Sequence, residues 1–259
     1  MEPSSGFDIS YESFQAVLQD DIAVLRFCRD FLLRTTDLEN RDRVLDYMDR
    51  IGRSRKVKIL VMAGSPESKG RQEFIDFFKS ARARGTDMIS VHRMYNVISQ
   101  LIIKIARLDK FVVYVNSGPV ISPYLNMGLA CDYRILADDA VIQNPCVDLG
   151  MAPKGGGGYF LPRMLGRRRA YDIMLSTRDI TAAEALSLGL VDELAPGHAL
   201  EAVALERARE YAAKPPRVVA GVKKLINFDF KDLQDYMEHE NEVLLQIIRT
   251  NDYQPWLDL

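Results

Sequence analysis

Short apolar runs alternate with longer stretches of helical spacing through the first two thirds of the chain. The runs at residues 14–18 and 22–27 flank three polar residues, a pattern that predicts a β-hairpin. The runs at residues 57–63 and 111–115 are nearly continuous in apolar side chains, as in parallel strands that are buried on both faces. Strands that alternate with helices in this way predict a layered α/β fold with right-handed crossovers.

Helical spacing is clearest at residues 38–51, where an apolar stripe ends at Gly52, and around residues 98–105. The same alternation then continues with a helix, two strands and a glycine-rich loop, at residues 123–131, 133–136, 141–143 and 155–158. Ligand sites in such folds lie where loops leave the strands and helices begin. We therefore expect the functional residues in these loops.

The last third of the chain is helical in pattern. Thr181 is the N-cap of a short helix with a capping-box glutamate, and residues 199–213 predict a longer helix that two prolines end. Two further helical patterns reach Trp256. We predict an α/β core at residues 1–195 and a C-terminal helical subdomain at residues 196–259.

Composition and charge exclude several classes of protein. The chain has 259 residues, 47% of them hydrophobic, and a formal net charge of -2, so no global positive field attracts nucleic acid or an anionic membrane. No apolar run has membrane-spanning length, and the first ten residues lack the pattern of a secretion signal. We expect a protein that binds neither nucleic acid nor a membrane.

The cysteines and histidines give no sign of a disulfide framework or a metal site. The three cysteines form no CxxC pair, and none of the three histidines has the spacing of a metal ligand. An odd number of unpaired cysteines fits a reducing compartment. We therefore expect a cytoplasmic protein without a bound metal.

Four segments in matching order resemble a known family. They are a strand before a loop, an "ACD-x-R-I" strand start, an "LG-x-x-P-x-x-GG" loop with its helix, and an "A-x-EA-x-x-x-GLV" signature, at residues 57–64, 129–137, 149–166 and 181–192. With these motifs the chain resembles the enoyl-CoA hydratase/isomerase (crotonase) superfamily over nearly its whole length.

The resemblance implies fold, ligand and assembly. It implies a crotonase (ClpP-like) fold of repeated ββα units with a C-terminal helical subdomain. It also implies a coenzyme A thioester, or a carrier-bound acyl thioester, as substrate without a separate cofactor. Family members usually form trimers, often paired into hexamers, and the apolar stripe Val243, Leu244, Ile247 and Ile248 suits burial against a neighbouring chain.

In this family two backbone N–H groups form an oxyanion hole that binds the thioester carbonyl and stabilises an enolate. The first loop is similar to the family's "S-A-G-A-D" and places Gly70 before the first donor, the N–H of Arg71. In the second loop Pro123 replaces the glycine that supplies the other donor, and proline has no N–H. Pro123 is also a normal first residue of a helix with Ser122 as N-cap. The missing donor must then come from the N–H of Tyr124 or from a side chain, and its loss costs about 10²–10³ in rate.

The acid and base positions of family hydratases have changed as well. The two glutamates of the hydratases correspond to Asn126 and Cys146, and a third acid, used by dienoyl-CoA isomerases and dehalogenases, corresponds to Lys154. An attacking water then has no general base at the expected place. Ordinary hydration is not expected.

Other residues near this site have alternative roles. Cys146 is a nucleophile if its pKa is lowered and otherwise a small core residue. Asp148 is the nearest carboxylate and shares a face with Cys146 if the segment is extended; otherwise it is a hydrogen-bonded loop residue. Lys154 neutralises an enolate or faces CoA phosphates, and Tyr124 donates its hydroxyl to the thioester oxygen or simply packs.

For coenzyme A itself, the resemblance places the adenosine end near residues 27–31, with contacts from Phe27, Arg29 and Lys69. Two functions stay open. The chain is an enzyme of the isomerase, hydrolase or lyase type on an acyl thioester, or a non-catalytic relative that binds a thioester or another subunit. A carboxylate or lysine beside the acyl carbon favours the enzyme, whereas a pocket filled by Tyr124, Pro123 and Met127 favours the binder.

Overall fold

The computed structural model describes residues 6–83 and 88–249, so the helical pattern predicted up to Trp256 runs past the described residues. The strands of the main sheet are β1 (Ile9–Ser10), β2 (Phe14–Gln19), β3 (Ile22–Phe27), β4 (Ile59–Ala63), β5 (Phe111–Asn116), β7 (Tyr133–Ala137) and β10 (Glu193–Ala195). Their order in the sheet is β1-β2-β3-β4-β5-β7-β10. The pairs from β1 to β3 are antiparallel, and those from β3 to β10 are parallel.

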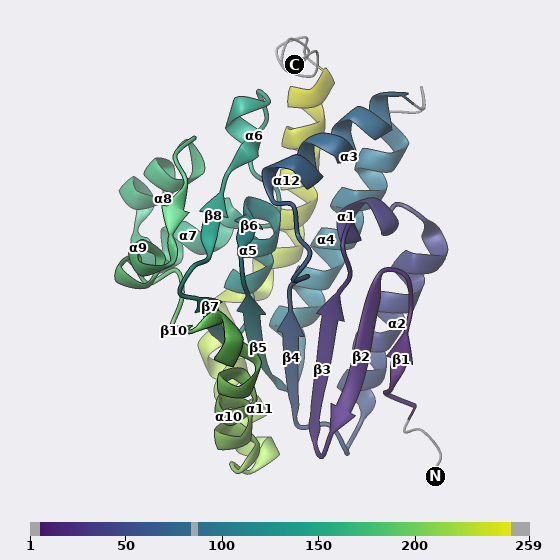
Figure 1. Cartoon of the computed structure of the whole chain (residues 1–259), viewed down its shortest axis with the longest axis vertical. Helices are drawn as coiled ribbons and strands as arrows, with labels where there is room; N and C mark the ends of the chain where they lie inside the picture. The colour runs from purple at the N-terminus through teal and green to yellow at the C-terminus, as the bar shows by residue number, and fades with distance from the viewer. Residues whose placement is uncertain (1–5, 84–87, 250–259) are drawn as a thin grey trace.

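A smaller sheet lies beyond the carboxyl ends of the parallel strands (Figure 1). It consists of β6 (Pro119–Ile121), β8 (Val141–Gln143) and β9 (Ile180–Thr181), with β8 between the other two. Twice the chain runs from the large sheet to the small sheet and then into a helix, through β5 and β6 and again through β7 and β8. This arrangement is the repeated ββα unit that was predicted.

The helices are α1 (Phe31–Arg34), α2 (Leu38–Arg53), α3 (Arg71–Ala83), α4 (Met88–Arg107), α5 (Ser122–Leu129), α6 (Pro145–Asp148), α7 (Gly157–Leu165), α8 (Arg167–Met174), α9 (Ala182–Leu188), α10 (Leu200–Ala212), α11 (Pro216–Ile226) and α12 (Leu233–Arg249). Two short 3₁₀ turns are present: η1 (Gly197–Ala199) leads into α10, and η2 (Asn227–Asp232) joins α11 to α12. The hairpin and the capped helix at Thr181 are confirmed. The predicted end of α2 was wrong, because this helix passes Gly52 and ends with Ser54 as its C-cap.

The C-terminal helices pack on two sides of the main sheet. Helix α10 contacts β3, β4, β5 and β7, whereas α12 lies along α4 on the other side (Figure 1). Leu244 and Ile248, which were expected to face a neighbouring chain, are buried within this one, and Val243 is exposed. The expected stripe therefore packs largely on its own core.

Within the described ranges, no helix combines the length and the apolar character needed to cross a membrane. The same residues contain no group of three or more His, Cys, Asp or Glu side chains placed to hold a metal ion.

Candidate functional site

The first half of the candidate site is the loop between β4 and α3. Gly70 has a φ of +56°, and a Cβ at this position would lie 2.5 Å from the Cβ of Pro119. Only glycine fits this close approach without strain. Arg71 follows as the first residue of α3, which leaves its backbone N–H without a partner inside the helix.

That N–H already holds a carbonyl oxygen. Arg71 N donates to Oε1 of Gln143, the last residue of β8, at 2.8 Å. The guanidinium of Arg71 is ion-paired with Asp148 and, at 3.0 Å, with Asp179. Gln143 Nε2 in turn donates to Asp179 Oδ2 at 3.3 Å. The expected donor is therefore present, and a side-chain amide occupies it.

The second half of the site is the start of α5. The helix begins at Ser122 with Ile121 as its N-cap, so the predicted cap was wrong by one residue and Pro123 is the second helical position. The Ser122 hydroxyl does not cap the helix but lies 3.5 Å from the sulfur of Cys146. Pro123 removes one N–H donor from this helix start, as the sequence indicated.

Tyr124 joins the two halves. Its hydroxyl donates to Oε1 of Glu73, in the first turn of α3, at 2.9 Å. Burial of the Glu73 carboxyl raises its pKa, while hydrogen bonds from Tyr124 and Ser68 lower the pKa only in part. Glu73 was not identified as a candidate from the sequence. Its position, two residues after the predicted oxyanion donor Arg71, was the signal that could have indicated it.

Asn126 and Lys154 have structural partners. Asn126 Nδ2 donates to the backbone oxygen of Lys154 at 3.0 Å. Lys154 is 1% exposed, and its ammonium donates to Glu240 Oε2 at 2.6 Å and to Ser99 Oγ at 2.8 Å. Burial lowers the pKa of Lys154, and Glu240 counteracts this shift. Lys154 therefore does not face CoA phosphates, which corrects that expectation.

Cys146 does not have the environment of a nucleophile. Residues 145–148 form the short helix α6 and are not extended. Cys146 and Asp148 therefore do not share the strand face that was expected. Cys146 is 1% exposed, and burial raises the pKa of its thiol to about 12. It is therefore held as a thiol, whereas Asp148 is a half-buried partner of Arg71.

The residues expected at coenzyme A fall into two groups. Phe27 is 2% exposed and packs in the core with its ring centroid 4.2 Å from that of Phe31, so its expected contact with adenosine is not available. Lys69 is exposed beside the first loop, and Arg29 is exposed and ion-paired with Asp30. Of the three residues, only the two cations are exposed at the surface.

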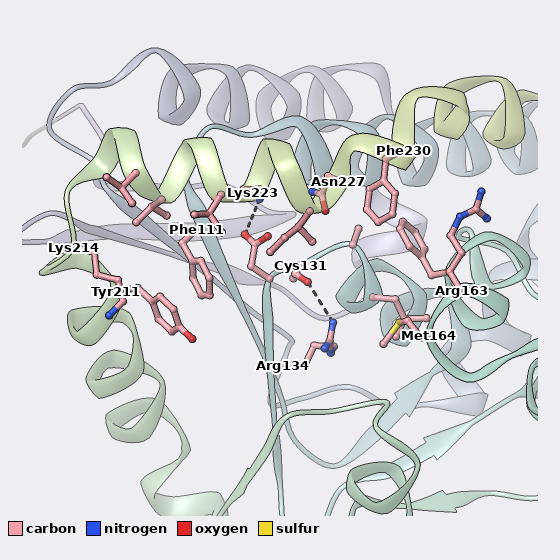
Figure 2. A pocket seen from close by; sticks show the side chains of 18 residues that line it. Phe111, Cys131, Arg134, Arg163, Met164, Tyr211, Lys214, Lys223, Asn227 and Phe230 are labelled. Atoms are coloured by element: carbon pink, nitrogen blue, oxygen red, sulfur yellow. Dashed lines mark hydrogen bonds and ion pairs between the residues drawn. The ribbon is translucent and has the colours of Figure 1, made fainter.

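The structure has one small cavity beside the site and a larger one apart from it. One of about 20 Å³ lies beside Asn126, Ser122 and Asn144, and it has room for about one water molecule. A larger one, of about 450 Å³, lies under α11, with aromatic side chains of Phe111 and Phe230 along it (Figure 2). No residue of the two loops lines the larger cavity, which is therefore separate from the carbonyl-binding position.

Sequence comparisons point to one family. The profile of the enoyl-CoA hydratase/isomerase family matches residues 22–256 of this chain. The 4-chlorobenzoyl coenzyme A dehalogenase-2 of an Arthrobacter species is 26% identical over 223 residues, which are 85% of this chain and 80% of that protein. The fatty acid oxidation complex subunit alpha of Shewanella frigidimarina is 38% identical over 108 residues, 40% of this chain and 15% of that protein.

Solved structures match over nearly the whole chain. An enoyl-CoA hydratase from Bacillus halodurans superposes with a TM-score of 0.84 at 20% identity and covers 95% of this chain and 99% of that one. An enoyl-CoA hydratase from Mycobacterium avium subsp. paratuberculosis has a TM-score of 0.80 at 21% identity and covers 97% and 100%. These likenesses confirm the predicted crotonase fold with its helical C-terminal region.

Proposed function

Because this chain belongs to the enoyl-CoA hydratase/isomerase family, we propose that it acts on an acyl-CoA or carrier-bound acyl thioester whose carbonyl oxygen binds the N–H of Arg71. The observation that carries this proposal is the bond from that N–H to the amide oxygen of Gln143. An amide oxygen is the same kind of acceptor as a thioester oxygen, so the position is shaped for a carbonyl. The start of α3 adds a field that favours negative charge on that oxygen.

The reaction we propose is not hydration. The two hydratase positions hold Asn126, whose amide is bound to a backbone carbonyl, and Cys146, whose pKa is raised to about 12. Neither group accepts a proton from water near neutral pH. Dehalogenation of a coenzyme A ester, the reaction named for the Arthrobacter relative, supports acyl-CoA chemistry other than hydration in this family.

A thioester-binding protein without catalysis is the second candidate. The side chains of Tyr124, Pro123 and Met127 are all buried at the start of α5, which is the packing expected of a binder. Glu73 favours the first candidate, an enzyme, because its carboxyl is bonded to Tyr124 at the start of α5. Proton exchange at the acyl α-carbon separates the two candidates.

For assembly and location we keep the family expectation of a cytoplasmic homotrimer or hexamer. Exposed apolar side chains on α11 support burial against another chain; they are Val218, Val222, Leu225 and Ile226. Light scattering at micromolar concentration tests the assembly, and a monomer contradicts it.

Calorimetric titration with acetyl-CoA and butyryl-CoA tests the proposed binding mode. Arg71→Pro removes the N–H at a helix start, where proline is tolerated, and Arg71→Ala is the matched control that loses only the guanidinium. We expect Arg71→Pro to bind roughly twofold to twelvefold more weakly than Arg71→Ala, the value of one hydrogen bond. Equal affinities of the two variants contradict the binding mode, and no binding of either ligand at millimolar concentration contradicts the proposed function.

A further inference from the structure

Glu73 and Tyr124 meet between the two helix starts of the site. Glu73 lies two residues after the Arg71 donor in the first turn of α3, and Tyr124 is the third residue of α5. Their residues are 5% and 6% exposed, and the oxygen atoms of the two side chains are 2.9 Å apart. A buried carboxyl group is thus held in the same helix turn as the N–H proposed to bind the thioester carbonyl.

The groups around this carboxyl leave it able to exchange a proton. Tyr124 Oη donates to Oε1, while Ser68 Oγ is 3.4 Å from Oε2 and also 3.2 Å from the backbone oxygen of Pro119. Oε2 therefore has only a weak, shared hydrogen bond from a side chain, and a backbone hydrogen bond from Lys69 also lowers the pKa of the carboxyl. The charged group that acts on Glu73 is Asp30, which raises its pKa, and among the described residues no cation offsets this shift.

A purely structural role does not explain this pair well. The free-energy cost of removing a carboxyl from water without a cation nearby exceeds what one hydrogen bond from a hydroxyl contributes. An apolar side chain would therefore be more stable at this position if its only role were to pack α3 against α5. The ring of Tyr124 already packs beside Phe27, with centroids 6.3 Å apart, and needs no carboxyl for that. Perturbed carboxyls of this kind gather at functional sites.

We propose that Glu73 is the acid–base residue of this site and exchanges a proton with the α-carbon of a thioester bound at Arg71, with Tyr124 as its positioning residue. This inference rests on the proposed function. A Glu73 oxygen takes the α-proton, the C–H bond breaks, and its electron pair forms an enolate whose oxygen lies at the Arg71 N–H. The carboxyl then returns the proton to the acyl group, so the step needs no oxidant or other reactant.

Hydrogen–deuterium exchange tests this step directly. Acetyl-CoA and butyryl-CoA are incubated with the protein in D₂O, and loss of the α-proton signal is followed by NMR, with binding measured in parallel by calorimetry. Glu73→Gln keeps the size and the contact with Tyr124, and we expect it to exchange about a hundredfold or more slowly with affinity nearly unchanged. Asp76→Asn, at an exposed acid on the same helix, is the matched control and is expected to exchange like the unaltered protein.

Tyr124→Phe gives a second readout. The Tyr124 hydrogen bond lowers the pKa of Glu73, so its loss is expected to move the rise of exchange to higher pH. Thermal melting shows whether each variant is folded; if Glu73→Gln is not, the shift in Tyr124→Phe decides. Binding without any exchange overturns this inference and favours the second candidate, a thioester-binding protein without catalysis. Exchange by Glu73→Gln at the unaltered rate overturns this inference while leaving the proposed function intact. Absence of binding overturns both.

Discussion

Replacing Gln143 by methionine is expected to tighten the binding of an acyl-CoA thioester. In the structure the Arg71 N–H is bonded to Gln143 Oε1 at 2.8 Å, and a ligand carbonyl must displace this oxygen before it binds. A hydrogen bond of this kind contributes about 0.5–1.5 kcal/mol net. Methionine has a similar length and no carbonyl, so removing the competitor corresponds to a gain of about twofold to twelvefold in affinity.

Calorimetric titration of butyryl-CoA into Gln143→Met and into the unaltered protein measures this gain. Asp179→Asn is the matched control, because it removes a partner shared by Gln143 and Arg71 but leaves the Gln143 carbonyl in place. We expect the control to change affinity by less than about twofold. If Gln143→Met binds no more tightly than the control, the carbonyl of the ligand does not occupy the position of the amide oxygen, and the reasoning is refuted.

Three further predictions concern buried ionisable groups. Glu240→Gln leaves the Lys154 ammonium without a counter-ion and is expected to lower the free energy of unfolding in urea by about 3–5 kcal/mol, whereas a loss below about 1 kcal/mol contradicts a stabilising pair. The Cys146 thiol, with its pKa raised to about 12, is expected to resist a thiol reagent at about pH 8 in a folded Cys28→Ser variant, and rapid labelling at Cys146 contradicts its burial. Because the pKa of Glu73 is raised in the folded protein, the protonated carboxyl contributes stability that is fully present below the usual carboxyl pKa. This contribution to the free energy of unfolding is lost as the pH rises through the raised pKa. Glu73→Gln is expected to remove that decline from urea titrations across this pH range.

Apolar periodicity was enough to predict most elements of the fold. The hairpin partners, the buried strands β4 and β5 and the cap at Thr181 are determined by residues close together in the chain, where pattern and propensity act. Most errors lie at boundaries. Helix α2 continues through Gly52, because a helix packed on a core tolerates a glycine that a local pattern takes as its end.

The partners within the site were beyond such reasoning. Arg71 and Gln143 are 72 positions apart, Glu73 and Tyr124 are 51 apart, and Lys154 and Glu240 are 86 apart. A sequence pattern identifies each residue type but not which side chain of another element comes within hydrogen-bonding distance. For the same reason Lys154 was interpreted as a candidate for ligand charge, although its partner on α12 uses that charge inside the protein.

The changed residues at the two hydratase positions depend on their surroundings and are not isolated replacements. The Asn126 amide donates to the backbone oxygen of Lys154, and a carboxylate there would present an acceptor to an acceptor. The same backbone segment is fixed from its other side, because Glu240 binds the Lys154 ammonium and accepts from the N–H of Gly156 at 2.8 Å. Returning a glutamate to position 126 alone would therefore bury an unpaired carboxylate and not rebuild a hydratase. Asp148 and Asp179 are ion-paired with Arg71, whereas the Glu73 carboxyl is buried and bonded to Tyr124, so the acid–base chemistry that we propose for this site depends on Glu73.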